Sequence, residues 1–250
     1  MIPHLLILGG TTEASALART VADAGLRAVL SYAGRVDKPR AQPIPVRVGG
    51  FGGVDGLAHY LRAEGVTHVV DATHPFAAQM SANAVAACAA TDVPLIALTR
   101  APWQAGPQDR WTLVPDIAAA VASLARPPRR VFLAVGRMHL AMFAAQPQHR
   151  YLLRLVDQPD GLPFPDCQVV VDRGPFTAED DKDLMKNHDI DLVVSKNAGG
   201  TGARSKIDAA RELGLPVLMI DRPAIPPRDE AQTPAQVMNW LAHSGVNLGV

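Results

Sequence analysis

The feature that most restricts the fold of this chain is a regular alternation of short apolar segments with helix-type patterns. In the first half, the short apolar segments are predicted strands over residues 4–8, 28–32, 46–48, 67–71 and 94–98. Between them, apolar side chains recur at the spacing of one helix face, which predicts helices over residues 13–24, 54–64 and 77–90. Strands that alternate with helices indicate a parallel sheet with helices on both faces.

The second half repeats this pattern after an interruption. Residues 100–110 have the composition of a loop, and Ala125-Arg126-Pro127-Pro128 is typical of a boundary. Further strands are predicted over residues 130–135, 151–156, 168–172, 192–195 and 216–220. We therefore predict an α/β protein of two halves, a nucleotide-binding domain over residues 1–125 and a second domain over residues 126–250, with a ligand cleft between them.

Composition argues against several classes of protein. The 24 basic and 24 acidic side chains cancel, which disfavours a general nucleic-acid or membrane-surface binder. The two cysteines, Cys88 and Cys167, lie far apart and outside any CxxC pattern, as expected for free thiols in a reducing compartment. The eight histidines lack zinc-ligand spacing, so no metal is expected. With no signal peptide and no apolar stretch near the roughly 20 residues of a membrane span, we expect a cytoplasmic protein.

A turn rich in glycine and threonine joins the first predicted strand to the first helix. It has the sequence Gly9-Gly10-Thr11-Thr12-Glu13-Ala14, a GxTxxA variant of the dinucleotide fingerprint GxGxxG. A helix N-terminus after such a turn presents backbone N–H groups and a positive dipole end to an anion. We therefore expect Gly9 to Glu13 to bind a pyrophosphate, with the hydroxyl groups of Thr11 and Thr12 as added donors. A plain turn without a ligand is the alternative.

The end of the second predicted strand indicates which dinucleotide is bound. In an NAD site, an acidic residue at this place binds the ribose 2′-hydroxyl. This chain has Ser31-Tyr32-Ala33-Gly34-Arg35 there, with no carboxylate to repel a 2′-phosphate. Ser31 as a donor and Arg35 as a cation favour NADPH over NADH. The alternative is that Arg35 is a solvated loop residue.

Three other segments have compositions that suit ligand binding. Asp71-Ala72-Thr73-His74-Pro75-Phe76 follows the fourth strand, and we expect Pro75 in the first turn of the next helix with Thr73 or His74 as its cap. The functional interpretation places this loop beside the nicotinamide, where His74 carries a proton, whereas a capping loop without chemistry is the alternative. Ser195-Lys196-Asn197-Ala198-Gly199-Gly200-Thr201 predicts a second anion site opposite the first, with an ordinary glycine-rich loop before a helix as the alternative. Gly49-Gly50-Phe51-Gly52-Gly53 admits a close ligand or is a flexible connector.

Taken together, these segments resemble the precorrin-6A reductase family of corrin biosynthesis. The matching pieces follow one order along most of the chain: residues 7–14, 49–53, 71–76, 195–201, 206–211, 215–217 and 221–223. The Asp-x-Thr-His-Pro-Phe and Ser-Lys-Asn-x-Gly-Gly pieces are the specific ones. The resemblance implies two Rossmann-like domains with a tetrapyrrole in the cleft. It also implies hydride transfer from a nicotinamide cofactor to precorrin-6A, giving precorrin-6B.

The resemblance also implies roles for individual residues. Thr73, Pro75 and Phe76 are expected to border the nicotinamide. Substrate carboxylates or the far side of the cofactor are expected to meet Lys196, Asn197, Gly199, Gly200, Thr201 and Lys206. His74 and Lys196 are candidate general acids, with protons from substrate or water as the alternative.

Ser31 and Arg35 favour NADPH and the cobalt-free, aerobic branch of the family. A cobalt-precorrin-6A reductase of the anaerobic branch is one alternative. The others are a non-redox nucleotide-sugar or sugar-phosphate enzyme and a non-catalytic nucleotide sensor.

Overall fold

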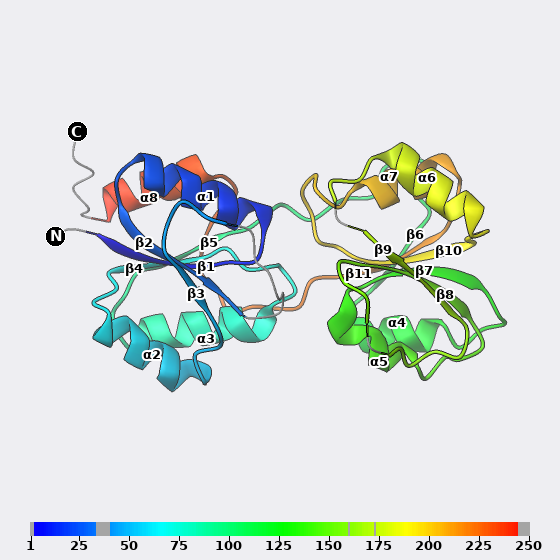
Figure 1. Cartoon of the computed structure of the whole chain (residues 1–250), viewed down its shortest axis with the longest axis horizontal. Helices are drawn as coiled ribbons and strands as arrows, with labels where there is room; N and C mark the ends of the chain where they lie inside the picture. Colours follow the sequence, from blue (N-terminus) through cyan, green and yellow to red (C-terminus); the bar gives the residue numbers. More distant parts are fainter. Residues whose placement is uncertain (1–2, 34–40, 160, 173, 245–250) are drawn as a thin grey trace. The chain divides into compact units, whose positions relative to one another are not determined.

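A computed structural model describes residues 3–33, 41–159, 161–172 and 174–244 of the chain. It contains two six-stranded sheets, and every strand pair in both sheets is parallel (Figure 1). The chain forms two compact units, residues 1–100 with 224–250 and residues 101–223. The predicted α/β class, with two mainly parallel halves and helices on both faces of each sheet, is confirmed.

The sheet of the first unit has the strand order β12-β5-β4-β1-β2-β3. Its strands are β1 (His4–Leu8), β2 (Arg27–Tyr32), β3 (Val46–Val48), β4 (His68–Asp71), β5 (Leu95–Leu98) and β12 (Asp229–Ala231). All residues of β1 and β4 are buried. Burial on both faces explains why the central strands are nearly continuous apolar runs rather than alternating ones.

Four helices cover this sheet (Figure 1). They are α1 (Thr12–Asp23) and α8 (Pro234–His243) on one face, and α2 (Gly53–Ala63) and α3 (Ala78–Ala89) on the other. Because successive side chains of a strand point to opposite faces, β1 contributes to two cores. Leu5 and Ile7 pack with Leu17 of α1, and Leu6 and Leu8 pack with Leu57 of α2.

The sheet of the second unit has the order β6-β11-β10-β7-β8-β9. Its strands are β6 (Trp111–Val114), β7 (Arg130–Ala134), β8 (Arg150–Leu155), β9 (Cys167–Val171), β10 (Leu192–Lys196) and β11 (Val217–Ile220). One face carries α6 (Ala178–Asn187) and α7 (Ser205–Glu212), and the other carries α4 (Ile117–Ser123) and α5 (Leu140–Phe143), with the 3₁₀ turn η1 (Arg137–His139) before α5 (Figure 1). Phe132, Val193 and Met219 pack with Ile207 on the α7 side.

Each sheet is completed by an edge strand from the opposite part of the sequence. β6 follows the first five strands along the chain, yet it pairs with β11 of the second unit. β12 follows β11 along the chain, yet it pairs with β5 of the first unit. The units therefore differ from the ranges expected from the sequence, because residues 101–125 belong to the second unit and residues 224–250 to the first.

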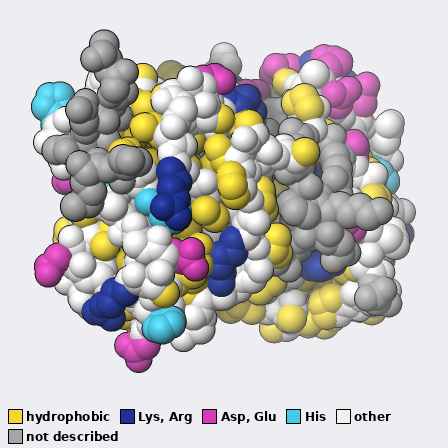
Figure 2. Space-filling view, turned by 60° about the vertical axis from the view of Figure 1, so that its left-hand side comes forward, with side chains coloured by type: hydrophobic (Ala, Val, Ile, Leu, Met, Phe, Trp, Pro, Cys, Tyr) yellow, Lys and Arg dark blue, Asp and Glu magenta, His cyan; other side chains and the backbone are white. Residues whose placement is uncertain are grey.

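The described surface carries mixed charge. On the face in Figure 2, the Lys and Arg side chains are scattered among apolar, acidic and neutral side chains and do not form one basic surface. Within the described ranges, no helix is long and apolar enough to cross a membrane.

Candidate functional site

Three of the predicted segments meet at the carboxyl edge of the first sheet. Leu8, the last residue of β1, lies beside Ser31 of β2 and Asp71 of β4. Two hydrogen bonds connect the loop after β1 to its neighbours: Gly9 N–H donates to Ser31 O of β2 at 2.8 Å, and Thr11 Oγ1 donates to Ala72 O of the loop after β4 at 2.8 Å. The carboxyl edge of a parallel sheet is where ligands of this class of fold bind.

The first loop joins β1 to α1 through a closely packed turn in which two positions favour glycine. Gly10 has a φ of 124°, which an L side chain rarely adopts. A Cβ on Gly9 would lie 2.7 Å from the Leu30 Cδ1 atom. Thr11 is the N-cap of α1, since its Oγ1 accepts from Ala14 N–H at 3.1 Å. The single hydroxyl hydrogen of Thr11 goes to Ala72, so this side chain orders the loop instead of pointing a donor at a ligand.

Glu13 is paired with a cation that sequence analysis missed. Thr12 Oγ1 donates to Glu13 Oε2 at 3.1 Å, and the same oxygen lies 3.5 Å from Arg100 Nη1. A carboxylate at this helix N-terminus would repel a phosphate, and the Arg100 guanidinium offsets its charge. One feature of the sequence could have indicated this pairing: Arg100 comes two residues after β5 and therefore lies at the same edge of the sheet.

At the end of β2, an unpredicted arginine takes the place beside Ser31. Ser31 is buried, and its Oγ accepts from Arg47 Nη1 at 3.1 Å. Arg47 belongs to β3 and lies opposite Ser31 in the β2–β3 register. Arg35, the predicted phosphate partner, lies outside the described residues.

The Asp71–Phe76 loop is held by a buried carboxylate. Asp71 accepts hydrogen bonds from Thr73 N–H at 3.1 Å, Thr73 Oγ1 at 2.7 Å and Ser81 Oγ at 2.6 Å. It also forms an ion pair with Arg228, the residue that precedes β12. Thr73 is therefore oriented by Asp71.

His74 and Pro75 lie in a tight turn, not in a helix. Ala77 N–H donates to His74 O at 2.7 Å, and α3 begins only at Ala78 with Ala77 as its N-cap. The expectation of Pro75 in the first helical turn, capped by Thr73 or His74, is therefore wrong. Proline instead occupies the second position of a β-turn, which its fixed φ favours. His74 Nδ1 accepts from Phe76 N–H at 3.2 Å, which places the hydrogen of the neutral ring on Nε2.

In the second unit, some side chains of the predicted substrate loop form hydrogen bonds with other residues of the same unit. Both ends of the Asn197 amide bind one residue: Oδ1 accepts from Trp103 N–H at 2.7 Å, and Nδ2 donates to Trp103 O at 3.0 Å. Trp103 Nε1 in turn donates to Gly200 O at 2.6 Å. Lys206 is buried and donates to Ala203 O at 2.6 Å. These contacts give Asn197 and Lys206 a part in shaping the loop.

Of the remaining predicted residues of that loop, Gly199 is buried and Lys196 and Gly200 are half-buried. Lys196 ends β10, and its Nζ lies 3.1 Å from Nδ1 of His139 in η1, a partner that sequence analysis missed. Thr201 is exposed. Gly199 and Gly200 have φ values of 70° and 68°, a conformation that favours glycine. That these residues meet a substrate stays a prediction.

Comparison with known proteins identifies the family. Residues 4–242 match the family described as Precorrin-6x reductase CbiJ/CobK. The chain belongs to this reductase family. It is 64% identical to the precorrin-6A reductase of Rhodobacter capsulatus over 97% of each chain, and 32% identical to the cobalt-precorrin-6A reductase of Priestia megaterium over 97% of this chain and 98% of that one. A solved structure of CobK precorrin-6A reductase matches 99% of each chain with a TM-score of 0.95 at 62% identity.

Membership of the precorrin-6x reductase family confirms the resemblance and the oxidoreductase class predicted from the sequence. It decides against the non-redox nucleotide-sugar enzyme and the nucleotide sensor. The fold agrees, because five strands in each unit follow the order of a dinucleotide-binding domain, with the exchanged sixth strand beside the fifth.

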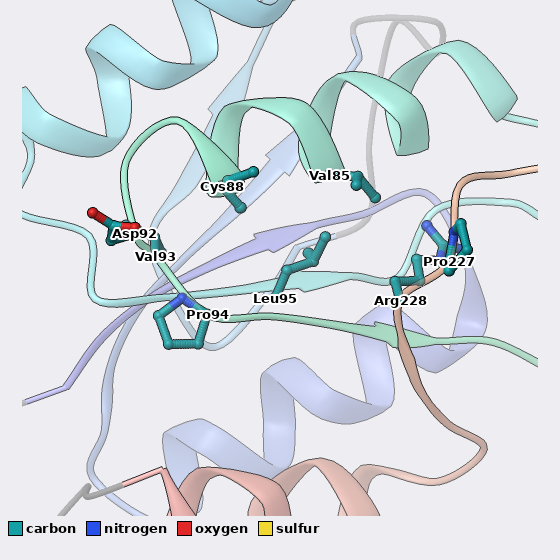
Figure 3. A pocket seen from close by; sticks show the side chains of 9 residues that line it. Val85, Cys88, Asp92, Val93, Pro94, Leu95, Pro227 and Arg228 are labelled. Atoms are coloured by element: carbon teal, nitrogen blue, oxygen red, sulfur yellow. The ribbon is translucent and has the colours of Figure 1, made fainter.

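A hollow of about 390 Å³ lies elsewhere in the first unit of this reductase. It is lined by Val85, Cys88 and Ala89 of α3, by residues 92–95 and by Pro227 and Arg228 (Figure 3). Burial, with a smaller effect of the Asp71 charge, raises the pKa of Cys88 to about 12. Burial, with the Asp166 charge, raises the pKa of Cys167 to about 11. Both thiols therefore stay protonated near neutral pH and are poor nucleophiles.

Proposed function

We propose that this chain reduces precorrin-6A to precorrin-6B by hydride transfer from NADPH, in cobalamin biosynthesis. The relatives support the cobalt-free substrate, since a relative named for precorrin-6A is 64% identical, whereas a relative named for the cobalt complex is 32% identical. The free thiols of Cys88 and Cys167 support a reducing, cytoplasmic location.

The observation that carries the choice of cofactor is the end of β2. Ser31 lies there beside the cationic Arg47, in the position where an NAD site places a carboxylate. The turn at Gly9 and Gly10 and the N-terminus of α1 suit a pyrophosphate, and Arg100 offsets the charge of Glu13. When bound, the nicotinamide supplies the hydride, and the protein supplies position and electrostatics.

The other residues are proposed to bind and orient the substrate. Thr73, Pro75 and Phe76 border the nicotinamide, in a loop that Asp71 holds in place. Lys196, with Gly199 to Thr201, meets the substrate carboxylates or the far side of the cofactor. Asn197 and Lys206 act through the shape of that loop.

The test of cofactor and branch is a comparison of kcat/KM values. With precorrin-6A, we expect NADPH to exceed NADH on the order of 100-fold, because a 2′-phosphate adds charge-assisted hydrogen bonds. Turnover of the cobalt complex under the same conditions is expected to be lower. Equal use of the two nucleotides would overturn the NADPH assignment, and faster turnover of the cobalt complex would overturn the choice of branch.

His74 is proposed to act as a general acid in its imidazolium form, giving up the Nε2 proton; protonation of Nδ1 releases the hydrogen bond that it accepts from Phe76 N–H in the neutral ring. His74→Ala is expected to slow single-turnover hydride transfer about 100-fold, the usual worth of a general acid. The measurement is the stopped-flow loss of reduced-nicotinamide absorbance at saturating NADPH. His74→Gln is the matched control, because it keeps a polar group but cannot deliver the proton. A full rate in both variants would remove His74 from the reaction.

A further inference from the structure

We propose that Arg47 recognises the 2′-phosphate of the dinucleotide, with Ser31 beside it, and so determines the preference for NADPH. The inference rests on the proposed use of NADPH, and it adds a residue that the sequence patterns did not indicate. Three observations support it: the position of Arg47 in the sheet, the neutral hydrogen-bond acceptors around its guanidinium, and the packing that holds this group in place.

Arg47 lies where the adenosine half of a dinucleotide would reach. It is opposite Ser31 in the β2–β3 register, and Ser31 is opposite Leu8, the residue before the Gly9–Glu13 loop. Adjacent strands are about 4.8 Å apart, so β3 lies about 10 Å from the strand that leads into the pyrophosphate loop. The 2′-phosphate is bound on this side of the pyrophosphate in folds with this strand order.

The contacts of Arg47 orient its guanidinium, and within the described residues they include no counter-ion for its charge. Nη1 donates to Ser31 Oγ at 3.1 Å and to Gly49 O at 2.6 Å, and Nη2 donates to Gly50 O at 2.8 Å. All three acceptors are neutral oxygens, and no carboxylate of the described residues forms an ion pair with Arg47. By contrast, several other partly or fully buried arginines are paired with carboxylates, as in Arg100–Glu13, Arg154–Asp181, Arg211–Asp109 and Arg228–Asp71.

The guanidinium is also held rigidly before any ligand binds. Its Cζ lies 3.8 Å from the centre of the Phe51 ring, and Phe51 packs edge-on against Tyr60 with ring centres 5.1 Å apart. Phe51 reaches this position because Gly56 has no side chain, since a Cβ there would overlap the Phe51 carbonyl. The Gly49–Gly53 segment is thus an ordered loop around the Arg47 side chain. A preorganised cation of this kind loses little entropy when it binds a phosphate.

The test uses calorimetric binding, which does not depend on turnover. Titrations compare NADP⁺ with NAD⁺, and 2′,5′-ADP with 5′-ADP, for wild type, Arg47→Gln and Arg47→Lys. Arg47→Gln is expected to weaken NADP⁺ and 2′,5′-ADP by about 10- to 100-fold, the worth of one charged hydrogen-bonding partner, and NAD⁺ by less than about threefold. Arg27→Gln is the matched control, because it removes one exposed charge at the amino end of β2 and is expected to change neither affinity.

The outcomes separate this inference from the proposed function beneath it. If wild type binds NADP⁺ and NAD⁺ equally, the proposed use of NADPH is wrong. If wild type prefers NADP⁺ and Arg47→Gln keeps that preference, or loses both nucleotides equally, the role of Arg47 is wrong. Arg47→Lys keeps the positive charge but lacks the paired N–H groups of the guanidinium. It provides the test if Arg47→Gln fails to fold. It is expected to weaken NADP⁺ several-fold and leave NAD⁺ unchanged, and an equal loss of both overturns the inference.

Discussion

Asp71→Ala is expected to lower the free energy of unfolding by about 3–5 kcal/mol, because it leaves a buried cation without its partner. The Asp71 side chain is 1% exposed and that of Arg228 is 8% exposed, so water cannot replace the missing carboxylate. Thr73 and Ser81 lose their acceptor in the same step. Unfolding by urea, followed by far-UV circular dichroism, measures the change.

Two further variants make this measurement specific. Asp166→Ala breaks the Arg150–Asp166 pair, whose side chains are 54% and 53% exposed, and is expected to cost less than about 1 kcal/mol. The double variant Asp71→Leu with Arg228→Met removes both buried charges and is expected to be more stable than Asp71→Ala. Similar losses for Asp71→Ala and Asp166→Ala would show that the Asp71–Arg228 pair is not desolvated in solution.

The Asp71–Arg228 pair also connects the fold to the site. Arg228 immediately precedes β12, the strand by which the end of the chain joins the first sheet. Its partner Asp71 ends β4 and orients Thr73 in the loop proposed to border the nicotinamide. One buried charge pair therefore holds the exchanged strand and this loop together, and its loss is expected to weaken both.

Most of the fold was predictable because burial leaves a pattern in the sequence. Central strands such as β1 and β4 are buried throughout and carry adjacent apolar residues, and the helices show one apolar face. The two strands absent from the prediction, β6 and β12, are edge strands. Leu113 of β6 is 65% exposed, and Asp229 and Glu230 make up most of the three-residue β12. Such short, half-solvated strands show no alternation of apolar and polar residues.

The division into units was not predictable from local signals. The segment Arg126-Pro127-Pro128 has the composition of a linker, but it joins α4 to β7 inside the second unit. Local sequence does not specify which of two sheets an edge strand joins. That choice depends on pairing between residues far apart in the chain, such as Asp229 with Ile96 and Trp111 with Val217.

The meeting of the loops that form the candidate nucleotide site was predictable, but the contacts of each side chain were not. Parallel strands end at one edge, so loops after β1, β2 and β4 had to lie together. The partners of Thr11 and Asn197 lie 61 and 94 residues away, which no short motif reveals. Arg47 was missed for a related reason, since only the β2–β3 pairing places it beside Ser31.

Gly199→Ala is the second change from which we expect a large effect, a loss of about 2–4 kcal/mol in the free energy of unfolding. Gly199 has a φ of 70°, and a Cβ there would overlap the Ala101 carbonyl oxygen and the Arg222 guanidinium. Arg222 donates to Asn197 O and Ala198 O, both at 3.0 Å, so displacing it disturbs the predicted substrate loop. The measurement is again urea unfolding, together with kcat/KM.

Gly214→Ala is the matched control that isolates the close contact. Gly214 has a φ of 65°, but no atom lies within 4 Å of a Cβ built on it. Backbone strain is therefore nearly the same in the two variants, and Gly214→Ala is expected to cost only about 1–2 kcal/mol with no change in kcat/KM. The difference between the two losses measures the approach of Ala101 and Arg222 to the loop. Equal losses of unfolding free energy in the two variants would mean that the loop moves away from Ala101 at little cost. Glycine at position 199 would then be needed only for its backbone conformation, not for the close contact.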